Sequence, residues 1–92
     1  MRVVWSPLAV REIARIFEYL FEFNPRAAEH VAHALVEAGE SLSRFPRRGR
    51  LVARTDKREL VTAYPYVIRY RVAGDVVRVL RVRHTSRRPT NP

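Results

Sequence analysis

The spacing of apolar residues along the chain predicts a helical first half and a strand-rich second half. Residues 2–5 form a short apolar run that stops at Ser6-Pro7, where a helix N-cap is followed by a proline suited to the first helical turn. From residue 9 to residue 21, apolar residues recur every three or four positions, and charged residues fill the opposite side. We therefore expect a strand followed by an amphipathic helix.

A second helix is predicted to start almost without a loop. Asn24-Pro25 repeats the cap and the proline, and apolar residues again recur at steps of three and four from Ala28 to Phe45. Gly39 lies inside this pattern, which fits either close packing against a neighbour or early fraying of the helix. Pro46 ends the helix because the residue before a proline is pushed out of the helical region. The two helices should be antiparallel.

Beyond the second helix the apolar period changes to two, as in strands. The last two predicted strands are joined by a hairpin turn through Gly74, and the full set is residues 51–53, 58–64, 66–72 and 76–84. One turn residue more or less would change which arginines share a sheet face with Arg69 and Arg71, so the register stays open. The alternation of Tyr66 and Tyr70 favours packing in the core over stacking on nucleic-acid bases.

These elements predict one α+β domain over residues 1–92. An N-terminal strand precedes a two-helix antiparallel hairpin, which packs on one face of a small antiparallel sheet in the order β-α-α-β-β-β. Residues 85–92 are polar and rich in proline, so we expect an irregular tail there. No internal repeat or linker divides the chain, and 92 residues suffice for one compact core but not for two.

The positive charge of the chain is concentrated in its second half. Residues 1–40 carry six Glu and four Arg, a net charge of −2, whereas residues 41–92 carry 14 Arg or Lys and three acids, a net charge of +11. Such a field attracts nucleic acid, acidic protein segments or anionic surfaces. Cysteine is absent, and no apolar run approaches the roughly 20 residues of a membrane span. With no secretion signal either, we expect a cytoplasmic protein that does not enter a membrane.

Familiar catalytic motifs are missing from the sequence. There is no glycine-rich phosphate loop, no GxSxG elbow and no HExxH motif. His30 and His33 lie one helical turn apart with Glu37 a further turn along, but without a third histidine or a cysteine nearby we expect neither a metal nor a cofactor. A basic run is interpreted as a solvated loop, with a specific anion-binding role as the alternative, and comprises Arg47, Arg48, Arg50 and Arg54.

The last predicted strand ends in the group LRVRHTSRRP, residues 80–89. His84 has Arg81 and Arg83 before it and Arg87 and Arg88 after it. A neutral imidazole beside arginines can act as a base toward a ribose 2′-hydroxyl while the arginines bind the phosphate. The same histidine can equally hydrogen-bond a backbone carbonyl and fix the tail. Because acid–base catalysis normally shows a second titratable partner, and none is obvious here, binding or structure is favoured over catalysis.

Short motifs follow one another along nearly the whole chain: VxWSPLAxREIxxI, the Asn-Pro and Ala27-Ala28 of the second helix, LSRFPRRGR, KREL, YVIRYRVAGDVVRVLRVRH and Arg87. In their order and spacing, these motifs resemble the ParE/RelE superfamily of bacterial type II toxins, particularly the ParE-like branch of plasmid stabilisation proteins. The resemblance implies the fold already derived. It also implies a cognate, ParD-like antitoxin, whose acidic C-terminal segment neutralises the toxin in a hetero-oligomer and whose N-terminal part binds promoter DNA.

Two activities occur in the superfamily that the chain resembles. ParE-like members bind DNA gyrase and stabilise its cleavage complex, whereas RelE-like members are ribosome-dependent mRNA endoribonucleases that use no metal. Val67 follows Tyr66 where RelE-like sequences usually have a catalytic arginine, and no tyrosine follows His84. The resemblance therefore implies a gyrase inhibitor that is not an enzyme. RNA cleavage remains the alternative, and its implied residues are Arg58, Arg81, His84 and Arg87.

The charge pattern and the resemblance together predict two binding surfaces. We expect the cationic side chains of the later strands to converge at one rim of the sheet. The target-binding residues predicted on this rim and on the tail are Arg58, Arg69, Arg71, Arg81, Arg83, His84, Arg87 and Arg88. The antitoxin-binding residues predicted on the helices and the basic sheet are Ile13, Phe17, Leu20, Leu35, Arg69 and Arg71.

Overall fold

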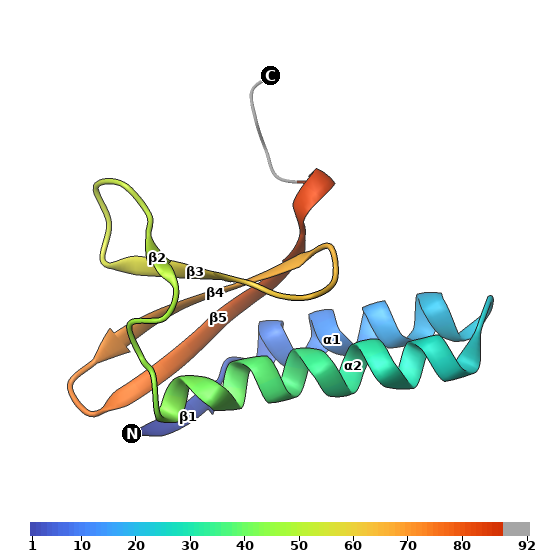
Figure 1. Cartoon of the computed structure of the whole chain (residues 1–92), viewed down its shortest axis with the longest axis horizontal. Coiled ribbons are helices and arrows are strands. Elements are labelled where there is room, and N and C mark those ends of the chain that lie inside the picture. The colour runs from blue at the N-terminus through green and yellow to red at the C-terminus, as the bar shows by residue number, and fades with distance from the viewer. Residues whose placement is uncertain (88–92) are drawn as a thin grey trace.

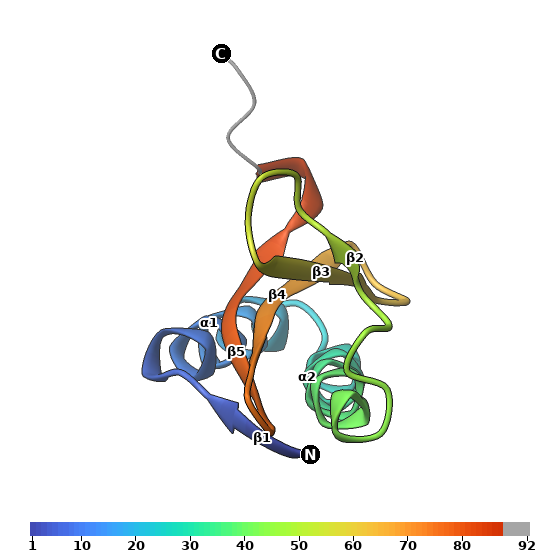
Figure 2. The ribbon, with the colours of Figure 1, turned by 90° about the vertical axis from the view of Figure 1, so that its left-hand side faces the viewer.

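A computed structural model describes residues 1–87 of the chain. One five-stranded sheet carries both helices on the same face (Figure 1), and in the view from its end both helices lie below β2 and β3 (Figure 2). This arrangement confirms the predicted α+β fold class, and the short strand β2 corresponds to the predicted strand at residues 51–53. The elements are β1 (Arg2–Trp5), α1 (Pro7–Phe21), α2 (Pro25–Glu40), the 3₁₀ turn η1 (Ser41–Ser43), β2 (Arg50–Leu51), β3 (Lys57–Val61), β4 (Tyr66–Ala73), β5 (Val76–His84) and the 3₁₀ turn η2 (Thr85–Arg87).

The sheet is mixed, whereas the sequence predicted an antiparallel one. Its strand order is β1-β5-β4-β3-β2, and the neighbours from β2 to β5 pair antiparallel as predicted. β1 instead runs parallel to β5, with Arg2 opposite Val76 and Trp5 opposite Val79. A parallel pair needs a long connection between its strands, and here the helical hairpin and the other strands supply it.

Local capping chemistry fixes where both helices begin. The Ser6 Oγ accepts a hydrogen bond from the Ala9 N–H at 3.0 Å, and the Asn24 Oδ1 accepts one from the Ala27 N–H at 3.1 Å. A proline follows each cap, as the sequence predicted. Within residues 1–87, neither helix has the length and apolar character needed to cross a membrane.

The second helix ends earlier than its apolar pattern predicts. α2 stops at Glu40, and the Ser41 hydroxyl donates to the Ala38 carbonyl oxygen at 2.6 Å, so it competes with the regular helical hydrogen bonds. Leu42 still reaches the core through η1, but Phe45 lies beyond the turn and is 60% exposed. The prediction that Phe45 belongs to the buried helix face is therefore wrong.

The core lies between the helices and the inner face of the sheet. Tyr66 and Tyr70 are both buried there, as predicted from their alternation. Gly39 of α2 packs directly on Trp5 of β1, because a Cβ at residue 39 would lie only 2.4 Å from the Trp5 Cη2. Close packing therefore explains this glycine. The largest fully buried side chains are Tyr70, Leu35, Leu42, Ile68, Val77 and Val79.

A β-bulge in the last hairpin decides which arginines share a face. Arg69 pairs with Arg81, but the next pair is Tyr70 with Val79, so Leu80 is the extra residue on β5. On both sides of the bulge, the register places arginines of the two strands on the side of the hairpin opposite the core, and two of them, Arg81 and Arg83, also line the groove beside α1. The full set is Arg69, Arg71, Arg78, Arg81 and Arg83. The register that the sequence left open is thus set by one irregular residue.

Candidate functional site

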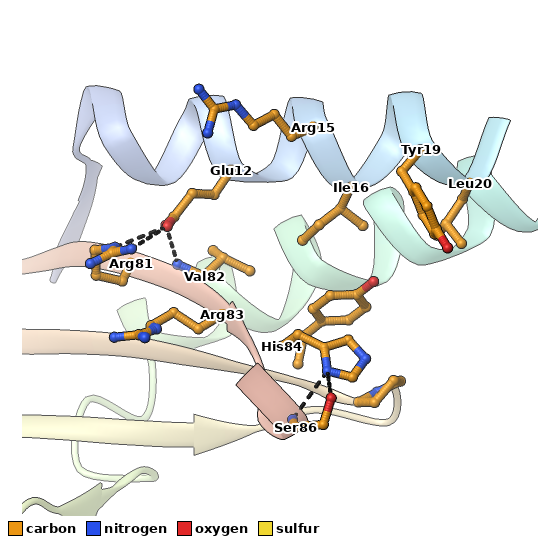
Figure 3. Close-up of a pocket in the computed structure, with 12 residues that line it drawn as sticks. Glu12, Arg15, Ile16, Tyr19, Leu20, Arg81, Val82, Arg83, His84 and Ser86 are labelled. Carbon is orange, nitrogen blue, oxygen red and sulfur yellow. Dashed lines mark hydrogen bonds and ion pairs between the residues drawn. The ribbon is translucent and has the colours of Figure 1, made fainter. Parts of the chain in front are cut away.

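A groove of about 740 Å³ runs between α1 and the C-terminal half of β5 (Figure 3). Its apolar wall comes mainly from Ile16 and Leu20 of α1 and Val82 of β5, and Tyr19 of α1 lies at the same wall. Polar and cationic side chains line the rest of the groove: Glu12, Arg15, Arg81, Arg83, His84 and Ser86. This combination can bind a ligand or a protein segment that carries both apolar and anionic groups.

The groove exists because β1 is shorter than the strand that it pairs with. β1 ends at Trp5, which pairs with Val79, so the later residues of β5 have no strand on that side. Side chains replace the missing strand: the Ser6 Oγ donates to the Leu80 carbonyl oxygen at 2.9 Å, and the Val82 N–H donates to Glu12 Oε1 at 2.7 Å. The edge of β5 is therefore satisfied here by residues at the start of α1.

Glu12 also fixes one of the predicted target-binding arginines. The Arg81 Nε and Nη2 both donate to Glu12 Oε2, at 2.9 and 2.7 Å (Figure 3). The hydrogen bond to Glu12 raises the pKa of Arg81 above its usual value, so the guanidinium stays charged. The paired carboxylate compensates this charge, and Arg81 contributes less to the field of the groove than a free arginine would.

His84 is oriented by the turn that follows it. Its Nδ1 accepts a hydrogen bond from the Ser86 backbone N–H at 3.1 Å and lies 2.7 Å from the Ser86 Oγ (Figure 3). Because a backbone N–H can only donate, Nδ1 carries no proton here, and the neutral ring is protonated at Nε2. The ring also packs edge-on against Tyr66, with ring centroids 5.1 Å apart. His84 therefore offers an N–H donor to the groove.

The structure brings together only part of the predicted target-binding set. Arg81, Arg83 and His84 lie along the groove, and Arg83 has no acidic partner within residues 1–87. Arg58 lies elsewhere: it pairs with Tyr70 in the sheet, and its Nη1 donates to the Gly49 carbonyl oxygen at 2.7 Å. The predicted convergence of all the cationic residues at one rim is therefore wrong.

Of the other predicted target-binding arginines, two form ion pairs on the sheet and two lie at the C-terminal end of the chain. Arg69 pairs with the buried Glu59 at 2.6 Å, and Arg71 pairs with Asp56 at 3.3 Å, both on the sheet face away from the helices. Only the backbone of Arg87 is described, in η2, and Arg88 lies outside the described residues. The predicted tail thus begins with a 3₁₀ turn, in which the Thr85 N–H donates to the Pro65 carbonyl oxygen at 2.9 Å.

The helical residues predicted to bind an antitoxin divide into two groups. Ile13, Phe17 and Leu20 are partly exposed along α1, and the Phe17 ring lies 5.5 Å from that of the exposed Phe21. Leu35 is fully buried against the sheet, so no partner can reach it, and its inclusion was wrong. The sequence pattern could not separate the partly exposed residues of α1 from the buried Leu35 of α2, because both helices show the same apolar period.

Several groove residues were missed by the sequence analysis, among them two that form hydrogen bonds there, Glu12 and Ser86. Glu12 belongs to the charged side of the helix pattern. Only its position next to the apolar residue Ile13 indicated that its side chain could face the sheet. Ser86 falls in the segment predicted as an irregular tail.

His30 and His33 lie exposed on α2, with His33 Nδ1 3.9 Å from a carboxylate oxygen of Glu37. Within the described part of the chain, no three metal-ligating side chains cluster.

Known toxins match the chain along nearly its whole length. The profile of the family described as "ParE toxin of type II toxin-antitoxin system, parDE" matches residues 3–89. Toxin RelE2 of Caulobacter vibrioides is 44% identical over 86 residues, which cover 94% of this chain and 97% of that protein. Toxin RelE1 of the same species is 40% identical over 85 residues, with 89% and 90% covered.

A solved structure described as "Chromosomal ParDE TA system from P. aeruginosa" shares the fold. It superposes with a TM-score of 0.82 at 22% identity and covers 91% of this chain and 95% of its own. Together with the profile match, the relatives at 44% and 40% identity settle the family. The chain belongs to the ParE family of toxins from type II toxin–antitoxin systems.

Proposed function

We propose that this toxin acts in the cytoplasm by binding DNA gyrase, without cleaving RNA itself. Gyrase inhibition is the activity that the resemblance to ParE-like members implies. The groove supports binding because Arg83 lacks an acidic partner within the described residues and His84 offers an N–H donor beside an apolar wall. Such a surface can bind an acidic segment of a protein through charge-assisted hydrogen bonds and apolar contacts.

The orientation of His84 is the observation that carries the proposal. A nuclease needs a base with a free lone pair directed at the ribose 2′-hydroxyl. In this toxin the Nδ1 lone pair of His84 is occupied by the Ser86 N–H, and Nε2 carries the proton of the neutral ring. The side chain is arranged to donate a hydrogen bond, which serves binding better than base catalysis.

A supercoiling assay with purified gyrase tests this proposal. We expect the toxin to inhibit supercoiling and to trap cleaved DNA, and Arg83→Gln to raise the inhibitory concentration. Arg26→Gln, on the exposed surface of α2, is the matched control and should have little effect. His84→Gln retains an N–H donor near the position of Nε2 and should keep most of the inhibition. Normal supercoiling at saturating toxin would refute the proposal.

The second candidate is a ribosome-dependent mRNA endoribonuclease. It is favoured by the RelE names of the relatives from Caulobacter vibrioides and by the proximity of Arg81, Arg83 and His84 along one groove. If His84 exchanges protons with RNA, His84→Gln should abolish cleavage, in contrast to its mild effect on gyrase inhibition. Primer extension after induction distinguishes the two, because intact transcripts during growth arrest would exclude cleavage.

Toxins of this family pair with a cognate antitoxin. We infer that the antitoxin of this chain is ParD-like and that its acidic C-terminal segment covers the partly exposed apolar stripe Ile13, Phe17 and Leu20 of α1. Phe17→Asp should then prevent the two proteins from copurifying, whereas Val36→Asp, which is 41% exposed on α2, should not. The antitoxin would contact operator DNA, and the toxin would reach DNA only through it.

A further inference from the structure

Residues 44–50, the arginine loop, run from η1 into the first residue of β2 and form a second surface that the proposed function does not use. The loop has the sequence RFPRRGR, with four arginines and no acidic residue. It leaves the C-terminal end of α2 and rises to β2, whereas η2 and the end of β5 lie at the other end of the sheet (Figure 1). Whatever binds the groove therefore need not contact this loop.

The backbone of the loop is fixed by the hydroxyl of a buried tyrosine. Tyr70 of β4 is fully buried, and its hydroxyl donates to the Pro46 carbonyl oxygen and accepts from the Gly49 N–H, both at 2.8 Å. The Cα of Gly49 packs on the same ring, because a Cβ there would lie 2.7 Å from the Tyr70 Cε1 and 2.8 Å from the Glu59 carbonyl oxygen. The loop is thus fastened to the core at two positions.

Arg58 of β3 adds a third attachment. Its Nη1 donates to the Gly49 carbonyl oxygen at 2.7 Å and to the Arg47 carbonyl oxygen at 3.4 Å. Within the loop, the Arg48 N–H donates to the Phe45 carbonyl oxygen at 3.1 Å. A surface loop with this many internal constraints presents its side chains in a fixed arrangement, which lowers the entropy cost of binding a partner.

The side chains that the loop presents are an aromatic ring and several cations. Phe45 is 60% exposed and forms, with Pro46, Arg47 and Arg48, a shallow hollow of about 610 Å³. Arg48 donates to the Ser41 Oγ at 2.9 Å. Within residues 1–87, no carboxylate pairs with any arginine of the loop. The hollow is therefore lined by apolar side chains and by arginines that no described carboxylate compensates.

We propose that the arginine loop binds single-stranded nucleic acid, with a base stacked on Phe45 and the flanking phosphates bound by Arg47 and Arg48. An exposed aromatic ring between cationic side chains is the arrangement that binds unpaired bases and their backbone. Guanidinium groups form bidentate hydrogen bonds with phosphate oxygens. A duplex keeps its bases stacked on one another, so only a single strand can use the Phe45 ring. The shared chemistry is a base with its phosphates, which DNA and RNA both provide.

Fluorescence anisotropy with short labelled oligonucleotides tests the proposal on the intact toxin, without gyrase or ribosomes. Single-stranded DNA, single-stranded RNA, duplex DNA and an acidic peptide form the four arms. Phe45→Ala should weaken binding to at least one single strand by about fivefold or more. Phe23→Ala is the matched control, because Phe23 is 71% exposed in the turn between α1 and α2 and should change binding by less than about twofold.

The salt dependence of binding gives an independent measurement. The double variant Arg47→Gln, Arg48→Gln should lower the slope of log K against log salt by about 1.4, since each phosphate contact to a single strand contributes about 0.7. The exposed helical arginines supply the control Arg11→Gln, Arg26→Gln, which should leave the slope nearly unchanged. Far-ultraviolet circular dichroism confirms that each variant is folded.

The arms separate the possible outcomes. Phe45-dependent binding to either single strand supports the proposal, and the comparison of DNA with RNA identifies which one the loop prefers. Equal losses from Phe45→Ala and Phe23→Ala, tighter binding to duplex than to single strands, or Phe45-dependent binding to the acidic peptide alone would each overturn it. The result is independent of gyrase inhibition, which is measured on the groove variant Arg83→Gln.

Discussion

Replacing Tyr70 with phenylalanine removes one oxygen atom from the core and both hydrogen bonds that connect it to the arginine loop. The Gly49 N–H is buried and loses its partner, which costs about 1–3 kcal/mol in the free energy of unfolding. The Pro46 carbonyl oxygen is only partly buried and can bind water instead, so its loss adds little. We expect Tyr70→Phe to destabilise the toxin by about 2 kcal/mol, or roughly 8–16 °C in Tm for a domain of this size.

Urea unfolding followed by circular dichroism measures this change. The slope of the unfolding free energy against urea should stay constant, because the variant exposes the same surface on unfolding. Tyr64→Phe is the matched control: Tyr64 is 37% exposed, and its hydroxyl has no partner within residues 1–87, so its removal should cost less than about 0.5 kcal/mol. A loss below about 0.5 kcal/mol for Tyr70→Phe as well would mean that water replaces the hydroxyl and that the loop is not held by it.

Three further predictions concern pH, packing and the groove edge. Burial raises the pKa of the Tyr70 hydroxyl above its usual value of 10.0, so the folded state keeps this proton up to a higher pH than the unfolded chain does. The free energy of unfolding should therefore fall as the pH rises above about 10, and it should fall less in Tyr70→Phe. Urea unfolding across that pH range measures the difference. Gly39→Ala should lower the free energy of unfolding by about 1 kcal/mol, because the clash with Trp5 outweighs the better helix propensity of alanine, and a gain would contradict the packing argument. Glu12→Gln keeps an acceptor for the Val82 N–H but loses the charge that pairs with Arg81. Thermal unfolding should show that the free energy of unfolding falls by about 1 kcal/mol. An unchanged Tm would argue against this ion pair.

Features of the fold that depend on neighbouring residues could be predicted from the sequence. The starts of both helices follow from a cap and a proline at Ser6-Pro7 and Asn24-Pro25, and these interactions span three residues. The parallel pairing of β1 with β5 could not be predicted in this way. It is accompanied by a hydrogen bond from Ser6 to Leu80, 74 positions apart, for which no local pattern exists. Likewise, the register of the last hairpin depends on one bulged residue.

The candidate site shows the same division between local and distant information. The cluster of Arg81, Arg83 and His84 was predictable, because these residues are neighbours on one strand. The position of Arg58 was not, since its location follows from the pairing of β3 with β4 and its hydrogen bonds from the path of the arginine loop. The sequence also placed Leu35 on a partner surface, although the sheet covers that side of α2.

The count of basic residues overstates the surface that is free to bind an anionic partner. Arg69 and Arg81 lie directly opposite each other on adjacent strands, an arrangement that is destabilising for like charges. Each has a carboxylate from another element, Glu59 for Arg69 and Glu12 for Arg81, and these acids offset the repulsion. Such arginines serve the fold first, because moving them toward a target would leave a carboxylate without its partner.

Partner binding should therefore depend on cations that have no such partner within the described residues. In the groove these cations are Arg15 and Arg83, and a second group of them lies on the arginine loop. These two sites lie at different ends of the sheet and differ in chemistry, since one borders an apolar helix face and the other an exposed aromatic ring. If the toxin binds a target and nucleic acid as proposed above, it can in this way keep one cationic surface available while the other is covered.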